Sequence, residues 1–183
     1  MEINSNALYQ NILDVFAPIL ETHDFPRRTV LHEAGRVCPR LYLVESGLLR
    51  AHYYLDDRDV TAHFALPGYS ITAPDSFITG RPSRYHLEAL TDTRAYAVER
   101  TALEHFLGEH PQHERLARQF TQLLYLELLD RMESMVFLTA RERYDRLVDT
   151  CPQVFEHMSL RHIASYLGIA PKTLSRVRAQ RAF

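Results

Sequence analysis

The spacing of apolar residues divides the chain into a β-rich first half and a helical second half. Between Arg27 and about Arg100, short apolar or alternating runs are separated by Gly, Pro and Asp residues that suit turns. Many short strands at roughly even spacing predict an all-β barrel, sandwich or roll. The predicted strands are residues 29–32, 41–44, 48–54, 60–66, 85–90 and 95–98.

Helical spacing flanks this β-rich segment. Residues 4–20 carry an apolar stripe at helical spacing, and the predicted helix ends near Pro26. Residues 101–107 predict a second, short helix, for which Thr101 and Glu104 fit a capping box.

A long apolar-periodic segment without Gly or Pro follows Pro111 and reaches about Leu138, and a further helix is predicted at 140–149. A helix of roughly 28 residues is some 40 Å long, which is more than a small β domain needs to cover itself. We therefore expect part of its stripe to pack against a second copy of the chain. The alternative is a long helix that packs only on its own β domain. The predicted dimer-interface residues are Leu116, Phe120, Leu124, Leu128 and Met135.

Residues 158–183 predict two short helices joined by a sharp turn. Ser159 is placed to cap the first helix, and the small Ala164 lets the two helices cross closely. Gly168 suits a turn that requires positive φ, and Pro171 suits the first turn of the second helix. This spacing is typical of a helix-turn-helix, although a basic helix closing an unrelated bundle would share some of these features.

The same C-terminal segment is basic, whereas the rest of the chain is acidic. Residues 158–183 hold five of the 21 Lys and Arg residues, while all 23 Asp and Glu residues lie upstream. A segregated basic end favours binding to a polyanion, and in a helix-turn-helix the outward face of the second helix enters the major groove. Arg176 is the best candidate for a bidentate contact to guanine. The predicted DNA-binding residues are Lys172, Thr173, Ser175, Arg176 and Arg178.

The sequence offers little support for an enzyme or a metal site. Cys38 and Cys151 are isolated and lack metal-ligand spacing, so we expect two free thiols in a reducing cytoplasm. His52 and His63 lie on predicted strands, and an enzyme with a cupin-like roll would need more ligands than these two. The sequence shows no P-loop, nucleophile elbow or dinucleotide-binding glycine motif, no N-terminal signal segment and no apolar stretch long enough for a membrane span.

The order of these elements resembles that of the Crp/Fnr transcription regulators. The strongest local match is the run from Ile163 to Arg178, which is similar to the recognition signature of that superfamily. The sequence also contains segments that resemble landmarks of the family's β-roll, namely Pro67-Gly68, residues 77–80 and residues 88–90. The resemblance implies an α+β protein with an antiparallel β-roll (a double-stranded β-helix), a long dimerisation helix and a DNA-binding end. The implied domains are residues 1–110, 111–138 and 139–183.

The cassette that binds cyclic nucleotides in this family is altered here. The family's Gly-Glu pair, whose carboxylate holds the ribose hydroxyl, corresponds to Thr72-Ala73, so that carboxylate is missing. The family's phosphate-binding Arg is displaced by one residue, because it corresponds to Arg84 followed by the bulky Tyr85. We therefore do not expect cyclic AMP to bind in the usual mode. The candidate pocket for another effector consists of Asp75, Arg81, Arg84 and Tyr85, and a solvated surface is the alternative for its charged members.

Two further departures concern the C-terminal end. Pro171 and Lys172 replace an Arg and a Glu of the cyclic-AMP receptor pattern, so we expect a different target sequence. The sequence stops at Phe183, which leads us to expect that the wing usual in this superfamily is missing.

The leading hypothesis from the sequence is a cytoplasmic, homodimeric, sequence-specific regulator that binds double-stranded DNA. RNA polymerase and an unknown small-molecule effector are further candidate partners, and no catalytic residue, cofactor or metal is identified. The alternative is a ligand-binding signalling module whose C-terminal end no longer binds DNA.

Overall fold

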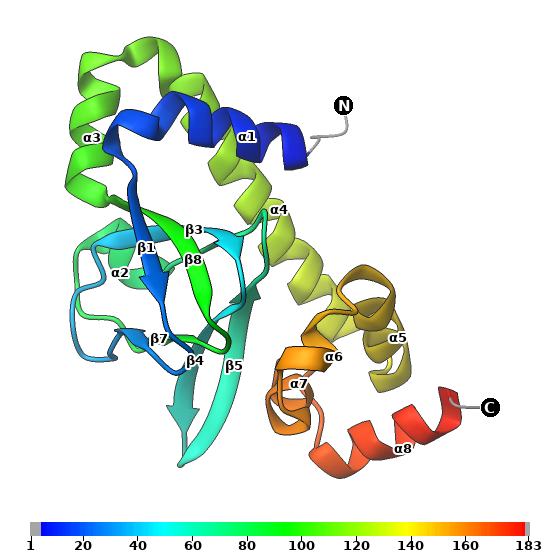
Figure 1. Ribbon diagram of the computed structural model, residues 1–183. Coiled ribbons are helices and arrows are strands. Elements are labelled where there is room, and N and C mark those ends of the chain that lie inside the picture. Colours follow the sequence, from blue (N-terminus) through cyan, green and yellow to red (C-terminus); the bar gives the residue numbers. More distant parts are fainter. Residues whose placement is uncertain (1–4, 182–183) are drawn as a thin grey trace.

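The computed structural model describes residues 5–181 and shows an α+β architecture in which helices surround two antiparallel sheets (Figure 1). Each sheet has four strands. The first contains, in spatial order, β1 (Glu21–Phe25), β8 (Thr93–Glu99), β3 (Arg40–Ser46) and β6 (Ser70–Ile71). The second contains β2 (Val30–His32), β7 (His86–Ala89), β4 (Leu49–Leu55) and β5 (Arg58–Ala65).

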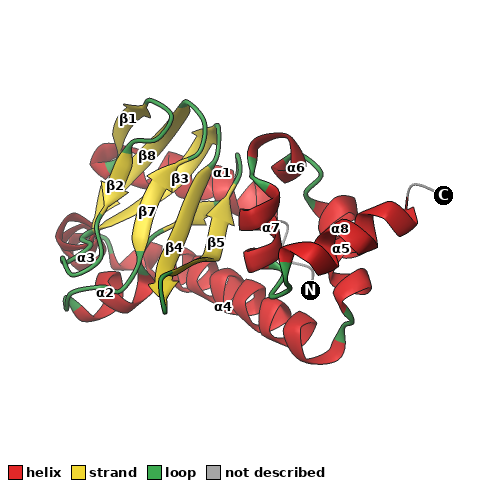
Figure 2. Ribbon diagram, turned by 90° about the horizontal axis from the view of Figure 1, so that it is seen from below, coloured by secondary structure: helices red, strands yellow, loops and turns green. Residues whose placement is uncertain are grey.

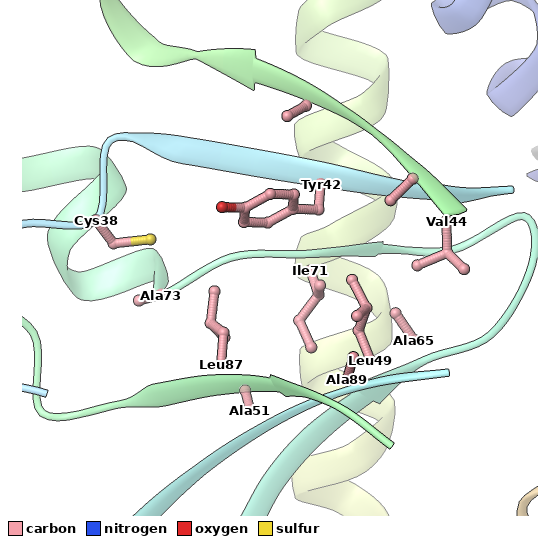
Figure 3. Close-up of a cluster of buried hydrophobic side chains, with 12 residues drawn as sticks. Cys38, Tyr42, Val44, Leu49, Ala51, Ala65, Ile71, Ala73, Leu87 and Ala89 are labelled. Carbon is pink, nitrogen blue, oxygen red and sulfur yellow. The ribbon is translucent and has the colours of Figure 1, made fainter. Parts of the chain in front are cut away.

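The two sheets pack face to face as a roll with a filled interior. Side chains from both sheets meet in one buried cluster, in which Tyr42 and Val44 face Leu49 and Leu87 (Figure 3). Buried and more exposed positions alternate along β7 and part of β8, because successive side chains point to opposite faces of a sheet. The expected roll is therefore confirmed.

Helices cover one side of the roll and form the C-terminal end of the chain (Figure 1). The helices before and within the roll are α1 (Ser5–Phe16), the 3-10 turn η1 (Ala17–Ile19) and α2 (Pro74–Thr79). After the roll come α3 (Arg100–Glu109), the 3-10 turn η2 (Pro111–His113) and the long α4 (Glu114–Phe137). The C-terminal region contains α5 (Ala140–Thr150), α6 (Val154–His157), α7 (Leu160–Tyr166) and α8 (Pro171–Arg181).

The N-terminal helix is shorter than predicted, and two strands were missed. The helix α1 ends at Phe16, and Glu21–Phe25 forms β1, which pairs with β8. β1 is an edge strand with a mostly exposed, polar sequence, so it carries no apolar alternation that could have predicted it. The two-residue β6 is too short for any periodicity.

The capping box predicted at Thr101 and Glu104 is wrong. The strand β8 runs directly into α3, which begins at Arg100 with Glu99 as a cap residue that makes no side-chain cap hydrogen bond. The backbone N–H of Arg100 instead donates to the carbonyl of Pro39, 2.8 Å away.

A capping box is found at the start of α5. The Thr139 hydroxyl accepts from the N–H of Glu142 (3.3 Å), and the Glu142 carboxylate accepts from the N–H of Thr139 (2.7 Å). These hydrogen bonds lower the pKa of Glu142. The cap therefore fixes the point at which the chain leaves α4 and enters the C-terminal region.

The C-terminal region and the roll share a buried apolar cluster. Leu48, Phe64 and Leu66 of the roll lie in the same cluster as the buried side chains of α5 to α8. The rings of Phe64 and Tyr166 have centroids 4.6 Å apart, and α7 lies beside β5 (Figure 2). The helices α5 to α8 are thus packed onto the outside of the roll.

Candidate nucleic-acid interface

The helices α7 and α8 form the predicted helix-turn-helix. The Ser159 hydroxyl accepts from the N–H of His162 at 3.1 Å and so caps α7 as predicted. Gly168 has φ of 65°, which a residue without Cβ adopts at little cost. The N–H of Ile169 donates to the carbonyl of Ala164 at 3.0 Å and closes the turn before Pro171 begins α8.

Apolar residues fasten these helices together and leave the basic side chains outside. Ile163, Ala164, Leu174 and Val177 are buried, as expected of the inner faces of a helix-turn-helix. The five predicted DNA-binding residues lie on α8: Thr173 is half-buried, and the other four, Lys172, Ser175, Arg176 and Arg178, are exposed. Arg161 of α7 is exposed as well.

This arrangement suits recognition of duplex DNA. The exposed Lys172 and Arg176 project from the N-terminal half of α8, which is the part of a recognition helix that meets base edges. Arg can donate two parallel hydrogen bonds to guanine, and Lys and Ser can reach bases or phosphates.

The candidate effector residues do not surround an empty site. One oxygen of the Asp75 carboxylate accepts from the N–H of Ser76 (2.9 Å) and the hydroxyl of Ser83 (2.7 Å), and the other accepts from the N–H of Arg84 (3.3 Å). Ser83 is buried, with 3% of its surface exposed. These backbone and hydroxyl donors of the segment are thus already bound to a carboxylate of the protein.

The side chains of the other members of the predicted effector pocket lie in different environments. Arg81 and Arg84 are exposed, and the guanidinium of Arg84 lies 5.5 Å from the centre of the Tyr85 ring. Tyr85 packs against the buried cluster inside the roll. The structure therefore brings Asp75 and Arg84 together through a backbone hydrogen bond, but it does not make the four side chains converge.

A small cavity lies where the roll meets α4. It has a volume of about 20 Å³ and is lined by residues that include Tyr9, Tyr69, Phe120, Leu124 and Glu127. That volume holds about one water molecule. Burial raises the pKa of Glu127 at this position.

The residues predicted for a dimer interface fall into two groups. Leu116 and Phe120 pack against α1 of the same chain, and Leu124 lines the small cavity. Leu128 and Met135 are exposed. They belong to a stripe of exposed apolar side chains on the second half of α4 that also includes Tyr125 (63% exposed), Met132 (56%) and Val136 (68%).

The two strand histidines considered for catalysis lie on different faces of their sheet. His63 pairs in register with the inward-facing Ala51, whereas His52 pairs with His86, and the rings of His52 and His86 stack 5.1 Å apart. Within residues 5–181 no group of three or more His, Cys, Asp or Glu side chains is arranged to hold a metal ion. Cys38 and Cys151 are both free thiols.

The comparison with protein families decides the classification. Residues 22–110, which span the roll, match the model of the cyclic nucleotide-binding domain. Similar solved structures include FixK2 from Bradyrhizobium japonicum, with 25% identity and a TM-score of 0.69 over 88% of this chain and 84% of that one. The chain has a cyclic nucleotide-binding domain and the Crp/Fnr fold.

Two more Crp/Fnr structures share this fold over nearly the whole chain. The regulator CLP from Xanthomonas campestris, described as responsive to c-di-GMP, has 19% identity and a TM-score of 0.70, covering 94% of this chain and 91% of that one. The catabolite activator protein of Thermus thermophilus has 19% identity and a TM-score of 0.56, covering 94% of this chain and 83% of that one. No protein of curated function matches the chain by sequence. No helix within the described residues is both long and apolar enough to cross a membrane.

Proposed function

We propose that the protein is a homodimeric, sequence-specific DNA-binding regulator of transcription. The observation that carries this proposal is the exposed basic face of α8, held by a capped helix α7 and a glycine turn. A helix-turn-helix of this form presents its second helix to the major groove. The fold shared with FixK2 and with the catabolite activator protein supports the same conclusion.

The exposed stripe on α4 supports a dimer. Tyr125, Leu128, Met132 and Met135 follow each other at intervals of three, four and three residues, which is the a/d spacing of a coiled-coil seam. Pairing two α4 helices along this seam would bury the stripe and hold two copies of α8 for the two half-sites of a symmetric operator. Leu116 and Phe120 of the predicted interface would not take part, because α1 covers them.

We further propose that the roll works without a cyclic nucleotide. Asp75 already accepts the hydrogen bonds of Ser76, Ser83 and Arg84, and a second anion beside its carboxylate would be repelled. The interior of the roll is filled by side chains that include the buried Tyr42, whose pKa burial raises to about 12. The residues present therefore do not fit a bound cyclic nucleotide.

The experiment that tests the main proposal is selection of genomic DNA fragments by the purified full chain at several salt concentrations. We expect enrichment of a two-fold symmetric site, with an affinity that falls as salt rises because phosphate contacts release counterions. Retention that is weak and independent of sequence would overturn the proposal.

A further inference from the structure

A buried arginine joins three strands of the roll to the helix-turn-helix. Arg50 of β4 has only 1% of its surface exposed. Its guanidinium forms ion pairs with Asp59 of β5 and with Glu88 of β7, the latter at 2.6 Å, and donates to the Thr61 hydroxyl at 3.0 Å. The same guanidinium lies 3.0 Å from Nε2 of His162 on α7. A single buried cation thus contacts both parts of the molecule.

The chemistry of this contact fixes the protonation state of His162. Arg has no acceptor, so Nε2 of His162 must accept the hydrogen bond from Arg50, which requires a neutral ring with its proton on Nδ1. Nδ1 of His162 is buried and has no hydrogen-bond partner. Burial, followed by the positive charges of Arg50 and Arg161, lowers the pKa of His162 to about 4.

Other polar and aromatic contacts hold α7 in the same position. The N–H of Thr61 donates to the Ser165 hydroxyl at 3.0 Å, and that hydroxyl donates to the Thr61 hydroxyl at 3.1 Å. From α4, the guanidinium of Arg131 lies 3.9 Å from the centre of the Tyr166 ring and donates to the Tyr166 carbonyl at 3.2 Å. Because β5 is an edge strand, the N–H of Thr61 depends on α7 for its partner.

We propose that His162 and Arg50 form an acid-sensitive latch that holds the helix-turn-helix against the roll at neutral pH and loosens it in acid. A protonated His162 would place an N–H where Arg50 now donates, and it would add a third cation beside Arg50 and Arg161. The latch itself does not depend on the proposed function. Its effect on DNA binding does rest on that function: loosening α7 would free α8 from its fixed position relative to α4.

The charges around His162 determine whether acid weakens or strengthens the docking of α7 on the roll. Its pKa is near the ordinary value of about 6.5 when α7 is released and lower when α7 is docked, so docking is strongest above about pH 6.5 and weakens as pH falls toward 4. The carboxylates of Asp59, which lies 3.6 Å from Nε2, and of Glu88 oppose this trend, but both are already paired with Arg50. The groups that face or adjoin His162 are Arg50 and His52 of β4, Asp59 of β5, Glu88 of β7, Arg161 of α7, and the exposed Glu156 and His157 of the adjacent α6.

Hydrogen exchange of the Thr61 amide, followed by NMR on the full chain without DNA, tests the latch. After correction for the intrinsic exchange rate, we expect protection of this amide to fall on the order of tenfold between pH 7.5 and pH 5, because each unit of pKa shift is a factor of about ten in the docking equilibrium. Amides in the paired strands β3 and β8 report whether the whole chain has instead unfolded.

Three variants separate the latch from a general acid effect. His162→Gln keeps an acceptor without a titrating ring, so Thr61 protection should stay constant with pH. His162→Lys carries the positive charge permanently, so protection should already be low at pH 7.5. His157→Gln removes an exposed histidine of α6 and should behave as the wild type does.

Constant protection of Thr61 in the wild type would overturn the proposal. So would a drop that persists in His162→Gln, or full protection of folded His162→Lys at pH 7.5. A failure of DNA selection would leave these results unaffected, because they are measured on the protein alone.

Discussion

The terminal methyl group of Met135 on α4 lies against Gly168 in the turn of the helix-turn-helix. A Cβ at Gly168 would collide with this methyl group, and φ at Gly168 is positive as well. The turn is therefore restricted mainly by its own backbone, because the end of the flexible Met135 side chain can move. This contact links the segment that we expect to pair in the dimer with the segment that we expect to read DNA.

Gly168→Ala should destabilise the protein by about 1 kcal/mol for the positive φ, and displacing the flexible end of Met135 should add a smaller amount. Gly35 is a matched control, because its φ of 86° is also positive but no atom lies within 4 Å of a Cβ there. We expect urea unfolding to rank Gly168→Ala below Gly35→Ala. Adding Met135→Ala should bring the two closer, and equal losses in the single variants would contradict the contact.

Arg176→Ala should weaken binding to the selected operator by about 1–3 kcal/mol, because a bidentate contact to guanine is lost. Binding to unrelated DNA should change much less. Arg118→Ala removes an equal charge from the exposed surface of α4 and serves as the control in the same titration. If the two variants bind the operator equally well, Arg176 does not read a base.

Leu128→Glu should convert the dimer to a monomer and lower operator affinity at the same time. Leu128 is 65% exposed, so the substitution places a charge in the proposed seam without disturbing the chain's own core. Sedimentation velocity gives the oligomeric state. Ile78→Glu on α2 changes an apolar residue of similar exposure (75%) and should leave the dimer intact. A Leu128→Glu protein that still sediments as a dimer would place the interface elsewhere.

Millimolar cyclic AMP or cyclic GMP should leave the melting temperature of the wild-type protein unchanged. A ligand present at about 100 times its Kd would add about 2.7 kcal/mol to the free energy of unfolding, which a thermal scan detects easily. We expect no shift, because the Asp75 carboxylate occupies the donors of Ser76 and Ser83. A clear rise with either nucleotide would show that this segment rearranges to admit a phosphate.

The sequence predicted the elements whose residues repeat at a regular spacing. The apolar period of α4, the short runs of β4 and β5 between turn residues, and the capped turn between α7 and α8 are local patterns, so each could be found without knowing its partner. The edge strand β1 was missed because pairing with β8, and not its own sequence, makes it a strand. The Thr101 cap failed for a similar reason, since Pro39 supplies the partner for the first N–H of α3.

The sequence indicates those parts of the candidate site whose residues are close together along the chain. The exposed set on α8 follows from helical spacing, whereas the role of Asp75 depends on hydrogen bonds to a loop that closes on it. The contact between Arg50 and His162 joins residues 112 positions apart, which no local pattern can predict. The sequence did contain one signal for this contact. Arg50 and His52 alternate with apolar residues on β4, which predicts a polar outer face that another segment can cover.

The apolar cluster shared by the roll and the C-terminal helices limits how the chain can be divided. The segment Leu138–Thr139 looks like a natural place to cut, yet a fragment that starts there would lack Leu48 and Phe64, which belong to the same buried cluster as Val154 and Leu174. Exchanging the C-terminal helices for those of a relative would therefore require changes on the outer surface of the roll as well. The roll and the C-terminal helices of this protein should evolve as matched halves and not as interchangeable modules.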